Sequence, residues 1–366
     1  MLRKLYDVDF GLMAVSFLLL CAGLLMVYSS SAIFSGETVS GPFFYFKKQL
    51  VWTAISMVFF IFFLNLNYKY LQKGATGIIV AVFLMLAGVL IFGKTVRGAR
   101  RWFDFGPINF QPSEIAKFGV IIFLADYLDK NKSKIKSLTR GLLPALLVVG
   151  GVSGLIAMGP DFGTPLVICL SSLALIFMAG AKIAHVLLLL SMTIPAVSFL
   201  LLTIPYVTSR VSAFLNPWEH ARSASYQLIQ SLAALGSGGL LGKGLGRGEI
   251  KRFYLPDMHT DFIFSIIGEE AGLLGTLLVV FAFIWFFYRG CKIARESRDF
   301  FGMLLAFGIT LTIVMQAFFN IAVCIGAVPT KGISLPFFSY GGSSLIFTLS
   351  AVGVLLNISS NKKSIM

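Results

Sequence analysis

Apolar runs of about 20 residues recur along the chain from Phe10 to Ile358, and short polar stretches separate them. A run of this length is what an α-helix needs to cross the hydrocarbon core of a bilayer. The pattern predicts about ten membrane-spanning helices, with expected bounds of 10–31, 49–66, 74–93, 113–128, 141–158, 164–181, 184–204, 262–288, 302–325 and 342–358. The first run is longer than the apolar core of a signal peptide, so we expect it to be retained as a helix. The sequence therefore predicts an all-α polytopic membrane protein with one membrane domain over residues 1–366.

Composition supports this prediction. The chain is 57% hydrophobic and 13% charged, with a mean hydropathy of +0.88. Soluble domains carry about 25% charged residues, so a soluble fold is excluded. The net charge of +14 is assigned to cytoplasmic loops and contact with anionic membrane lipids, and not to nucleic acid. The four cysteines, Cys21, Cys169, Cys291 and Cys324, lack the spacing of a metal site, and we expect neither a disulfide nor zinc.

Lysine and arginine residues indicate the orientation, because cytoplasmic loops carry an excess of them. Basic residues at 3–4, 69–73, 130–140, 182, 289–298 and 362–363 all fall on one side of the predicted topology. Both termini are therefore expected to be cytoplasmic.

Two basic segments fall on the opposite, extracytoplasmic side. One is 94–101, and the other is the long loop of about 205–260 between predicted helices 7 and 8. A loop of that length is typically functional or disordered. Two of its segments, 213–218 and 226–232, have the pattern of short amphipathic helices at a membrane surface. The alternative is a solvated charged face.

Asp261 is a carboxylate at the mouth of an apolar run. It lies where the long loop becomes a helix, and Ser265 and Glu269 follow it at helical spacing. Burial disfavours the charged form of a carboxylate, which suits a general base that takes a proton from a hydroxyl group. The alternative is that Asp261 only caps the helix. His259 either orients Asp261 or simply lies in the loop.

A second group of polar residues surrounds the start of the fourth predicted helix. The segment Arg97–Trp102 is rich in arginine, and Glu114 and Lys117 follow as neighbours three positions apart on the helix. One interpretation is a Glu114–Lys117 ion pair. The other is that Lys117 and the arginines, Arg101 among them, bind a pyrophosphate group.

Two further segments offer polar groups on the extracytoplasmic side. Asp161 lies in a very short turn, where turn chemistry alone explains an Asp. The stretch 328–344 is too rich in Pro, Gly and polar residues to span a membrane, and such a segment is tolerated only where it lines a cavity. Lys331 and Ser343 in this stretch could reach a polar head group.

Read together, these segments resemble the SEDS family of shape, elongation, division and sporulation proteins, and within it the FtsW division members. The motifs follow the family's order: Gly98-Ala-Arg-Arg-Trp102, Gln111-Pro-Ser-Glu114, Pro160-Asp-Phe-Gly-Thr164, Tyr226-Gln-Leu-Ile-Gln230, His259-Thr-Asp-Phe-Ile-Phe264, Pro329-Thr-Lys-Gly332 and Phe338-Ser-Tyr-Gly-Gly342. The resemblance implies a peptidoglycan glycosyltransferase with ten spans that acts on lipid II outside the membrane. It also implies that Asp261 is the catalytic residue, which deprotonates the acceptor 4-hydroxyl while undecaprenyl pyrophosphate leaves with inversion.

The same resemblance assigns expected roles to the other candidates. Arg101, Lys117 and Lys243 are expected to neutralise the leaving group. Glu114 and Asp161 are expected to support the site or to contact a divalent cation, Mg²⁺ or Mn²⁺, whose presence the sequence leaves open. Gln227, His259, Lys331 and Ser343 complete the expected substrate-binding set.

Partners and location also follow from the resemblance. A class B penicillin-binding protein, which is a transpeptidase, is expected as partner, together with other membrane proteins of the division or elongation machinery. The expected location is the bacterial cytoplasmic (inner) membrane, with the active site facing outward. Two alternatives to the glycosyltransferase stay open: a flippase for lipid II, or a non-catalytic scaffold of the cell-wall synthesis machinery.

Overall fold

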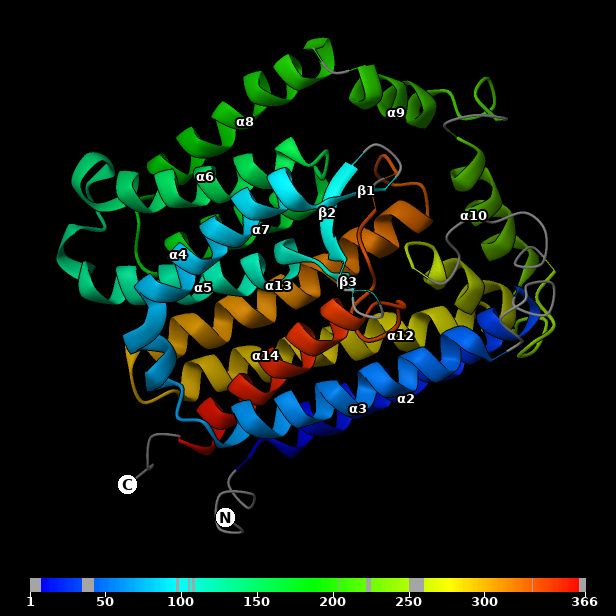
Figure 1. Cartoon of the computed structure of the whole chain (residues 1–366), viewed down its shortest axis with the longest axis horizontal. Coiled ribbons are helices and arrows are strands. Elements are labelled where there is room, and N and C mark those ends of the chain that lie inside the picture. The colour runs from blue at the N-terminus through cyan, green and yellow to red at the C-terminus, as the bar shows by residue number, and fades with distance from the viewer. Residues whose placement is uncertain are drawn as a thin grey trace.

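Ten helices of the computed structural model coincide with the ten predicted apolar runs (Figure 1). They are α2 (Phe10–Phe34), α3 (Phe44–Asn65), α4 (Lys69–Phe92), α5 (Pro112–Lys130), α6 (Leu143–Met158), α7 (Gly163–Met178), α8 (Ile183–Thr203), α12 (Ile263–Glu296), α13 (Phe300–Cys324) and α14 (Gly342–Ser360). The structure describes residues 8–34, 43–96, 99–104, 106, 109–203, 205–221, 225–249, 260–330 and 332–361.

Seven described helical segments are long and apolar enough to cross a membrane, and a polytopic membrane protein is confirmed. Of the other three expected spans, α7 has only 16 residues, and α8 has 21 residues, of which the fully described apolar stretch is Ile183–Met192. The third, α5, carries charged residues along its length, including Glu114 and Lys117. The count of ten spans therefore stays a prediction.

The centre of the bundle is formed by α13 and α14. In their apolar windows 72% and 78% of the residues are buried, compared with 17% in α3 and 28% in α4. α12 packs along α13, and α14 packs along α3, as Figure 1 shows. Because α13 is enclosed by protein, its polar side chains must find partners inside the fold.

Helix α12 is broken at Gly272, although the sequence predicted a continuous helix there. Gly272 has φ 67° and ψ −164°, which a residue with a side chain rarely adopts. The backbone groups around the break pair with the main chain of the Gly-rich segment 238–244. These hydrogen bonds are Lys243 N to Glu269 O (3.0 Å), Gly244 N to Glu270 O (3.0 Å), Leu273 N to Gly239 O (2.9 Å) and Leu274 N to Leu240 O (3.2 Å).

The predicted all-α class is confirmed, and the fold adds one small sheet that the sequence did not predict. Between α4 and α5 the chain forms an antiparallel sheet of β1 (Lys94–Val96), β2 (Ala99–Asp104) and β3 (Asn109–Phe110), in the order β1-β2-β3. Lys94 Nζ and Asp104 Oδ2 form an ion pair across this sheet, at 2.5 Å. Hydrogen bonds from Lys94 and from the Gly106 amide lower the pKa of Asp104. A three-residue strand is too short for alternation to show in the sequence.

The described residues of the long loop, which is expected on the extracytoplasmic side, form two helices, α9 (Pro205–Leu215) and α10 (Tyr226–Ser237). α10 covers the predicted amphipathic segment 226–232 and buries one side, with Leu228, Ser231 and Ala234 facing inward. The other predicted segment, 213–218, is helical only to Leu215. Short turns, η2 (Lys132–Lys134) and η3 (Leu138–Leu142), connect α5 to α6.

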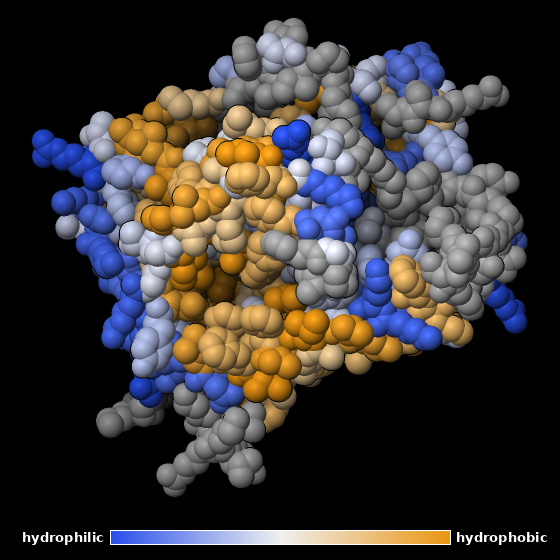
Figure 2. Space-filling view, viewed as in Figure 1, coloured by the Kyte–Doolittle hydropathy of each residue, from blue (hydrophilic) through white to orange (hydrophobic). Residues whose placement is uncertain are grey.

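Hydrophobic residues occupy the middle of the molecular surface in Figure 2, and hydrophilic residues gather at the left edge and toward the right. In Figure 1 the left side carries the α4–α5 end of the bundle, while β1–β3 and α10 lie to the right. An apolar band between two polar ends is the surface expected of a membrane protein.

Candidate active site

A cavity of about 1140 Å³ lies where the β-sheet, α5, α9, α10, α13 and the segment 328–344 meet. Six predicted site residues line it: Arg101, Glu114, Lys117, Gln227, Asp261 and Ser343. They come from separate parts of the chain, and the fold brings them to one place. The described lining carries four basic side chains, from Lys94, Arg101, Lys117 and Arg210, and two acidic ones, from Glu114 and Asp261. This excess of positive charge favours an anionic ligand.

Asp261 lies in the turn that precedes α12, and its half-buried side chain lines the cavity. The N-cap position of α12 is held by Phe262, so Asp261 lies one residue before the cap position. The backbone around Asp261 is fixed: Asn320 Nδ2 donates to Asp261 O at 2.7 Å, and Ser339 Oγ donates to Thr260 O at 2.5 Å. The carboxylate is therefore presented to the cavity from a fixed backbone.

Glu114 and Lys117 form the ion pair that one interpretation of the sequence predicted. Lys117 Nζ lies 2.9 Å from Glu114 Oε2, and both side chains are buried. Lys117 also donates to Gln316 Oε1 on α13. Since Lys117 lines the cavity as well, the ion pair does not exclude contact with a ligand.

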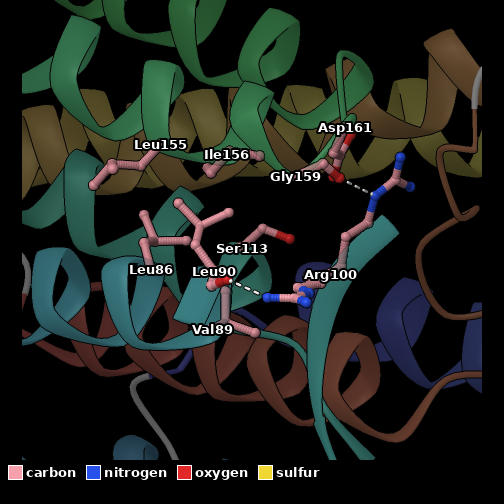
Figure 3. A pocket seen from close by; sticks show the side chains of 10 residues that line it. Leu86, Val89, Leu90, Arg100, Ser113, Leu155, Ile156, Gly159 and Asp161 are labelled. Atoms are coloured by element: carbon pink, nitrogen blue, oxygen red, sulfur yellow. Dashed lines mark hydrogen bonds between the residues drawn. The ribbon is translucent and has the colours of Figure 1, made fainter. Parts of the chain in front are cut away.

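Arg101 is tied to the turn between α6 and α7. Its Nε donates to Gly159 O at 2.6 Å, and its Nη2 donates to Pro160 O. Figure 3 shows the first of these bonds beside a small pocket of about 20 Å³, together with the 3.3 Å bond from Arg100 Nη1 to Leu90 O. The β-sheet is thereby joined to the α6–α7 turn and to the last part of α4.

Asp161 lines this small pocket, and the structure places it outside the described lining of the large cavity. Its carboxylate accepts from Thr164 Oγ1 at 2.8 Å and from the amides of Gly163 and Thr164 at 3.1 and 3.2 Å. These bonds satisfy the first amides of α7, which is the turn chemistry that the sequence offered as an explanation.

Lys243 also lies outside the described lining of the cavity. Its ammonium group is 3.3 Å from Glu269 Oε1 and 3.3 Å from Glu249 Oε2, beside the break in α12. Desolvation opposes protonation, but the hydrogen bonds to these two carboxylates outweigh it and raise the pKa of Lys243. His259 and Lys331 lie outside the described residues.

Two more residues link the segments around the cavity: Ser343, which was predicted as a site residue, and Arg210, which was not. Ser343 Oγ donates to Asn109 O at 3.1 Å and accepts from Gln111 N at 3.2 Å. Arg210 Nη1 donates to Thr330 Oγ1 at 2.7 Å and so joins α9 to the segment 328–344. Arg210 lies in the basic loop of about 205–260, and the sequence pattern did not mark it as a site residue.

No group of three or more His, Cys, Asp or Glu side chains that could hold a metal ion occurs among the described residues. Of the two acids considered for a divalent cation, Glu114 is paired with Lys117 and Asp161 with Thr164. The described residues thus provide no ready-made cation site.

The arrangement can be compared with known proteins. A family model described as "Cell cycle protein", which covers FtsW, RodA and SpoVE, matches residues 10–364. The chain belongs to this family. The predicted resemblance to SEDS proteins is confirmed.

Relatives of this FtsW/RodA/SpoVE chain match it over nearly its full length. It is 37% identical over 364 residues to the probable peptidoglycan glycosyltransferase FtsW of Geobacter sp. (strain M18), covering 99% of each chain. It is 40% identical over 361 residues to stage V sporulation protein E of Bacillus subtilis (strain 168), covering 98% of this chain and 99% of the relative.

Two solved structures share the fold of this FtsW/RodA/SpoVE chain. One, described as "Structural coordination of polymerization and crosslinking by a peptidoglycan synthase complex", matches with a TM-score of 0.81 at 28% identity, over 97% of this chain and 98% of that one. The other, the rod shape determining protein RodA of Thermus thermophilus, matches with a TM-score of 0.72 at 27% identity, over 98% of each chain.

Proposed function

We propose that the chain is a peptidoglycan glycosyltransferase that polymerises lipid II into glycan strands, with Asp261 as its general base. The observation that carries this proposal is the cavity in which a half-buried carboxylate and four basic side chains meet. The names of the relatives and the family membership supply the substrate class. The charges of the side chains that line the cavity suggest the division of chemical roles.

In the proposed reaction, Asp261 takes the proton from the 4-hydroxyl of the acceptor sugar as that oxygen attacks the anomeric carbon of the donor. The bond from this carbon to the pyrophosphate oxygen breaks, with inversion, and undecaprenyl pyrophosphate leaves. Negative charge grows on the leaving group, where Lys117, Arg101 and Arg210 stabilise it from the cavity wall. Arg210 is added here to the basic residues that the sequence suggested.

We further propose that the protein lies in the bacterial cytoplasmic (inner) membrane with this cavity on the outer side. The basic segments at the opposite end support that orientation. A class B penicillin-binding protein is the proposed partner, because a structural neighbour is a synthase complex that couples polymerisation to crosslinking. The relatives named FtsW support a division role within that machinery.

The experiment is glycan polymerisation from purified lipid II, with the protein reconstituted beside its penicillin-binding partner and a transpeptidase inhibitor. General bases contribute about 10²–10⁴-fold to rate, so Asp261→Asn should lower polymerisation at least about 100-fold. Size-exclusion profiles and partner binding should not change. Equal polymer from both proteins would overturn the assignment of Asp261. Absence of polymer from both would favour the flippase or scaffold alternatives.

A further inference from the structure

Helix α13 carries a buried polar stripe that points toward the cavity. Gln316, Asn320 and Cys324 are spaced four residues apart, which places them on one face of the helix. They are 5%, 1% and 0% exposed, respectively, within a helix whose other buried residues are mostly apolar. Buried polar groups on a central helix require partners, and these partners are parts of the active site.

Gln316 contacts the cationic side of the cavity. It accepts a hydrogen bond from Lys117 through Oε1, and its Nε2 donates to Ser334 O at 2.9 Å and to Ser334 Oγ at 3.1 Å. One side chain thus holds Lys117 and the segment 332–335 in a fixed relation.

Asn320, one turn further along, contacts the acidic side. Both hydrogens of its Nδ2 are used, one on Asp261 O and one on Ile333 O, each at 2.7 Å. The Asp261 carboxylate lies against Gly332, the residue before Ile333, since a Cβ added to Gly332 would be 3.0 Å from Asp261 Oδ2. The same amide group therefore sets the backbone that carries the carboxylate and the backbone against which the carboxylate rests.

We propose that Asn320 is a positioning residue for the glycosyl transfer, which holds Asp261 at a fixed distance from the Lys117 side of the cavity. The inference rests on the proposed function. Asn320 is not among the described lining of the cavity, so it acts through Asp261 and not on the substrate. A misplacement of a reacting group by about 1 Å costs on the order of 100-fold in rate, so a clamp of this kind has a measurable effect.

The chain offers a matched control. Asn357 on α14 is also fully buried, at 0% exposed, and also bonds two backbone groups: its Oδ1 accepts from Tyr68 N at 3.1 Å, and its Nδ2 donates to Leu64 O at 2.7 Å. These partners lie at the α3–α4 turn and outside the described cavity lining. Loss of this amide therefore reproduces the structural damage without touching the site.

The test compares Asn320→Leu and Asn320→Asp with Asn357→Leu, in the polymerisation assay described above. The first variant keeps the side-chain size and removes both donors, and the second is isosteric and directs a carboxylate at two carbonyl oxygens. We expect kcat per folded enzyme to fall about 10- to 100-fold in both Asn320 variants, with the apparent KM for lipid II within about threefold of wild type. Asn357→Leu should lower the melting temperature about as much as the Asn320 variants do, but it should keep kcat within about twofold of wild type.

Wild-type kcat in the folded Asn320 variants, or an equal kcat loss in Asn357→Leu, would overturn the proposal. Hydrogen exchange of the amides of 332–335 gives a readout that does not depend on activity, and it should rise in the Asn320 variants but not in Asn357→Leu. Unchanged exchange there would also overturn it. Failure of the proposed function looks different, because wild type itself would then give no polymer, or Asp261→Asn would polymerise as well as wild type.

Discussion

Glu114 and Lys117 are two opposite charges removed from water next to the cavity. Their ammonium and carboxylate groups are 2.9 Å apart, and their side chains are 8% and 4% exposed. The desolvation of such a pair offsets much of its mutual attraction, so the pair gives little net stability. Removal of one partner is strongly destabilising, because the remaining charge stays buried without its counter-ion.

We therefore expect Lys117→Met to destabilise the protein by about 3–5 kcal/mol, because Glu114 is left buried alone. The double variant Glu114→Gln with Lys117→Met should recover most of the lost stability. Polymerisation should be abolished in the single and in the double variant. Thermal or denaturant melts of the detergent-solubilised proteins give both values. A single variant as stable as wild type would show that the pair is not desolvated as the structure indicates.

Asp299 is a second residue whose charge is used structurally, at the other end of the bundle. It is the N-cap of α13, accepts from Gly302 N at 2.9 Å and pairs with Lys69 Nζ at 2.9 Å. Burial opposes ionisation, but the bonds from Lys69 and the Gly302 amide outweigh it and lower the pKa of Asp299. Loss of such a cap costs about 0.5–2 kcal/mol, which we expect for Asp299→Ala at neutral pH.

The pH dependence of this cap has a definite sign. A carboxyl group with a lowered folded-state pKa stabilises the protein above its unfolded pKa of about 3.9, and this stabilisation is lost as pH falls through the lower folded value. The difference in melting temperature between wild type and Asp299→Ala should thus be constant above about pH 5 and shrink below about pH 4. A difference that grew on acidification would contradict the lowered pKa.

At the scale of elements, the break in α12 determines how the Gly-rich segment is held. A Cβ at Gly272 would lie 2.3 Å from Gly242 N and 2.6 Å from Leu240 O, and φ at this position is positive. The break releases backbone groups from α12, and the segment 238–244 satisfies them. Helix and segment therefore form one unit that includes Lys243 and its ion pairs.

Gly272→Ala should detach the Gly-rich segment 238–244 from α12. We expect a loss of at least about 1–2 kcal/mol, from a backbone conformation that is essentially restricted to glycine together with the clash. Faster tryptic cleavage after Lys243 and Arg247 should accompany it. Gly236→Ala is the control, because Gly236 lies within α10 and an added Cβ there meets nothing within 4 Å. That variant should be as stable as wild type or more so, by up to about 1 kcal/mol. Equal rates of tryptic cleavage in the two variants would show that α12 and the Gly-rich segment do not form one unit.

Elements that depend on local pattern were predictable from the sequence, and those that depend on distant partners were not. The ten helices follow from long apolar runs, and the Glu114–Lys117 pair follows from helical spacing. The β-strands were missed, since they are only two to six residues long.

The break at Gly272 and the role of Asn320 depend on contacts with distant segments of the chain. Gly272 contacts Gly242 and Leu240, and Asn320 contacts Asp261 at a separation of 59 residues. A glycine in a helix and an asparagine in an apolar run each have several local explanations. Only the fold shows which partner each of them meets. The same reason explains why Lys243, basic and in the long loop, was expected at the cavity but pairs with Glu269.

At the scale of the whole molecule, the active-site candidates and the basic connecting loops lie at opposite ends of the helical bundle. The cavity residues gather around the β-sheet, α9 and α10, while the lysine-rich turn between α5 and α6 is at the far end of α5 from Glu114 and Lys117. Figure 2 shows the hydrophobic band between the two polar ends. Polymerisation outside the cell requires that the first end face outward and the second inward.

This orientation can be measured with single cysteines at the two ends. Trp218 beyond α9 is 78% exposed, and Lys134 in η2 is also exposed, so a cysteine at either position is open to reagent. A membrane-impermeant maleimide added to intact cells or spheroplasts should label Trp218→Cys at once and Lys134→Cys only after permeabilisation. The unmodified chain is the matched background. Its Cys324 is buried, and Cys21 and Cys169 lie within apolar helices, where a charged reagent does not penetrate. Cys291, toward the end of α12 that is expected to be cytoplasmic, should behave like Lys134→Cys if it reacts at all. The opposite labelling pattern would place the cavity in the cytoplasm, where an enzyme that extends glycan strands outside the membrane cannot have its active site.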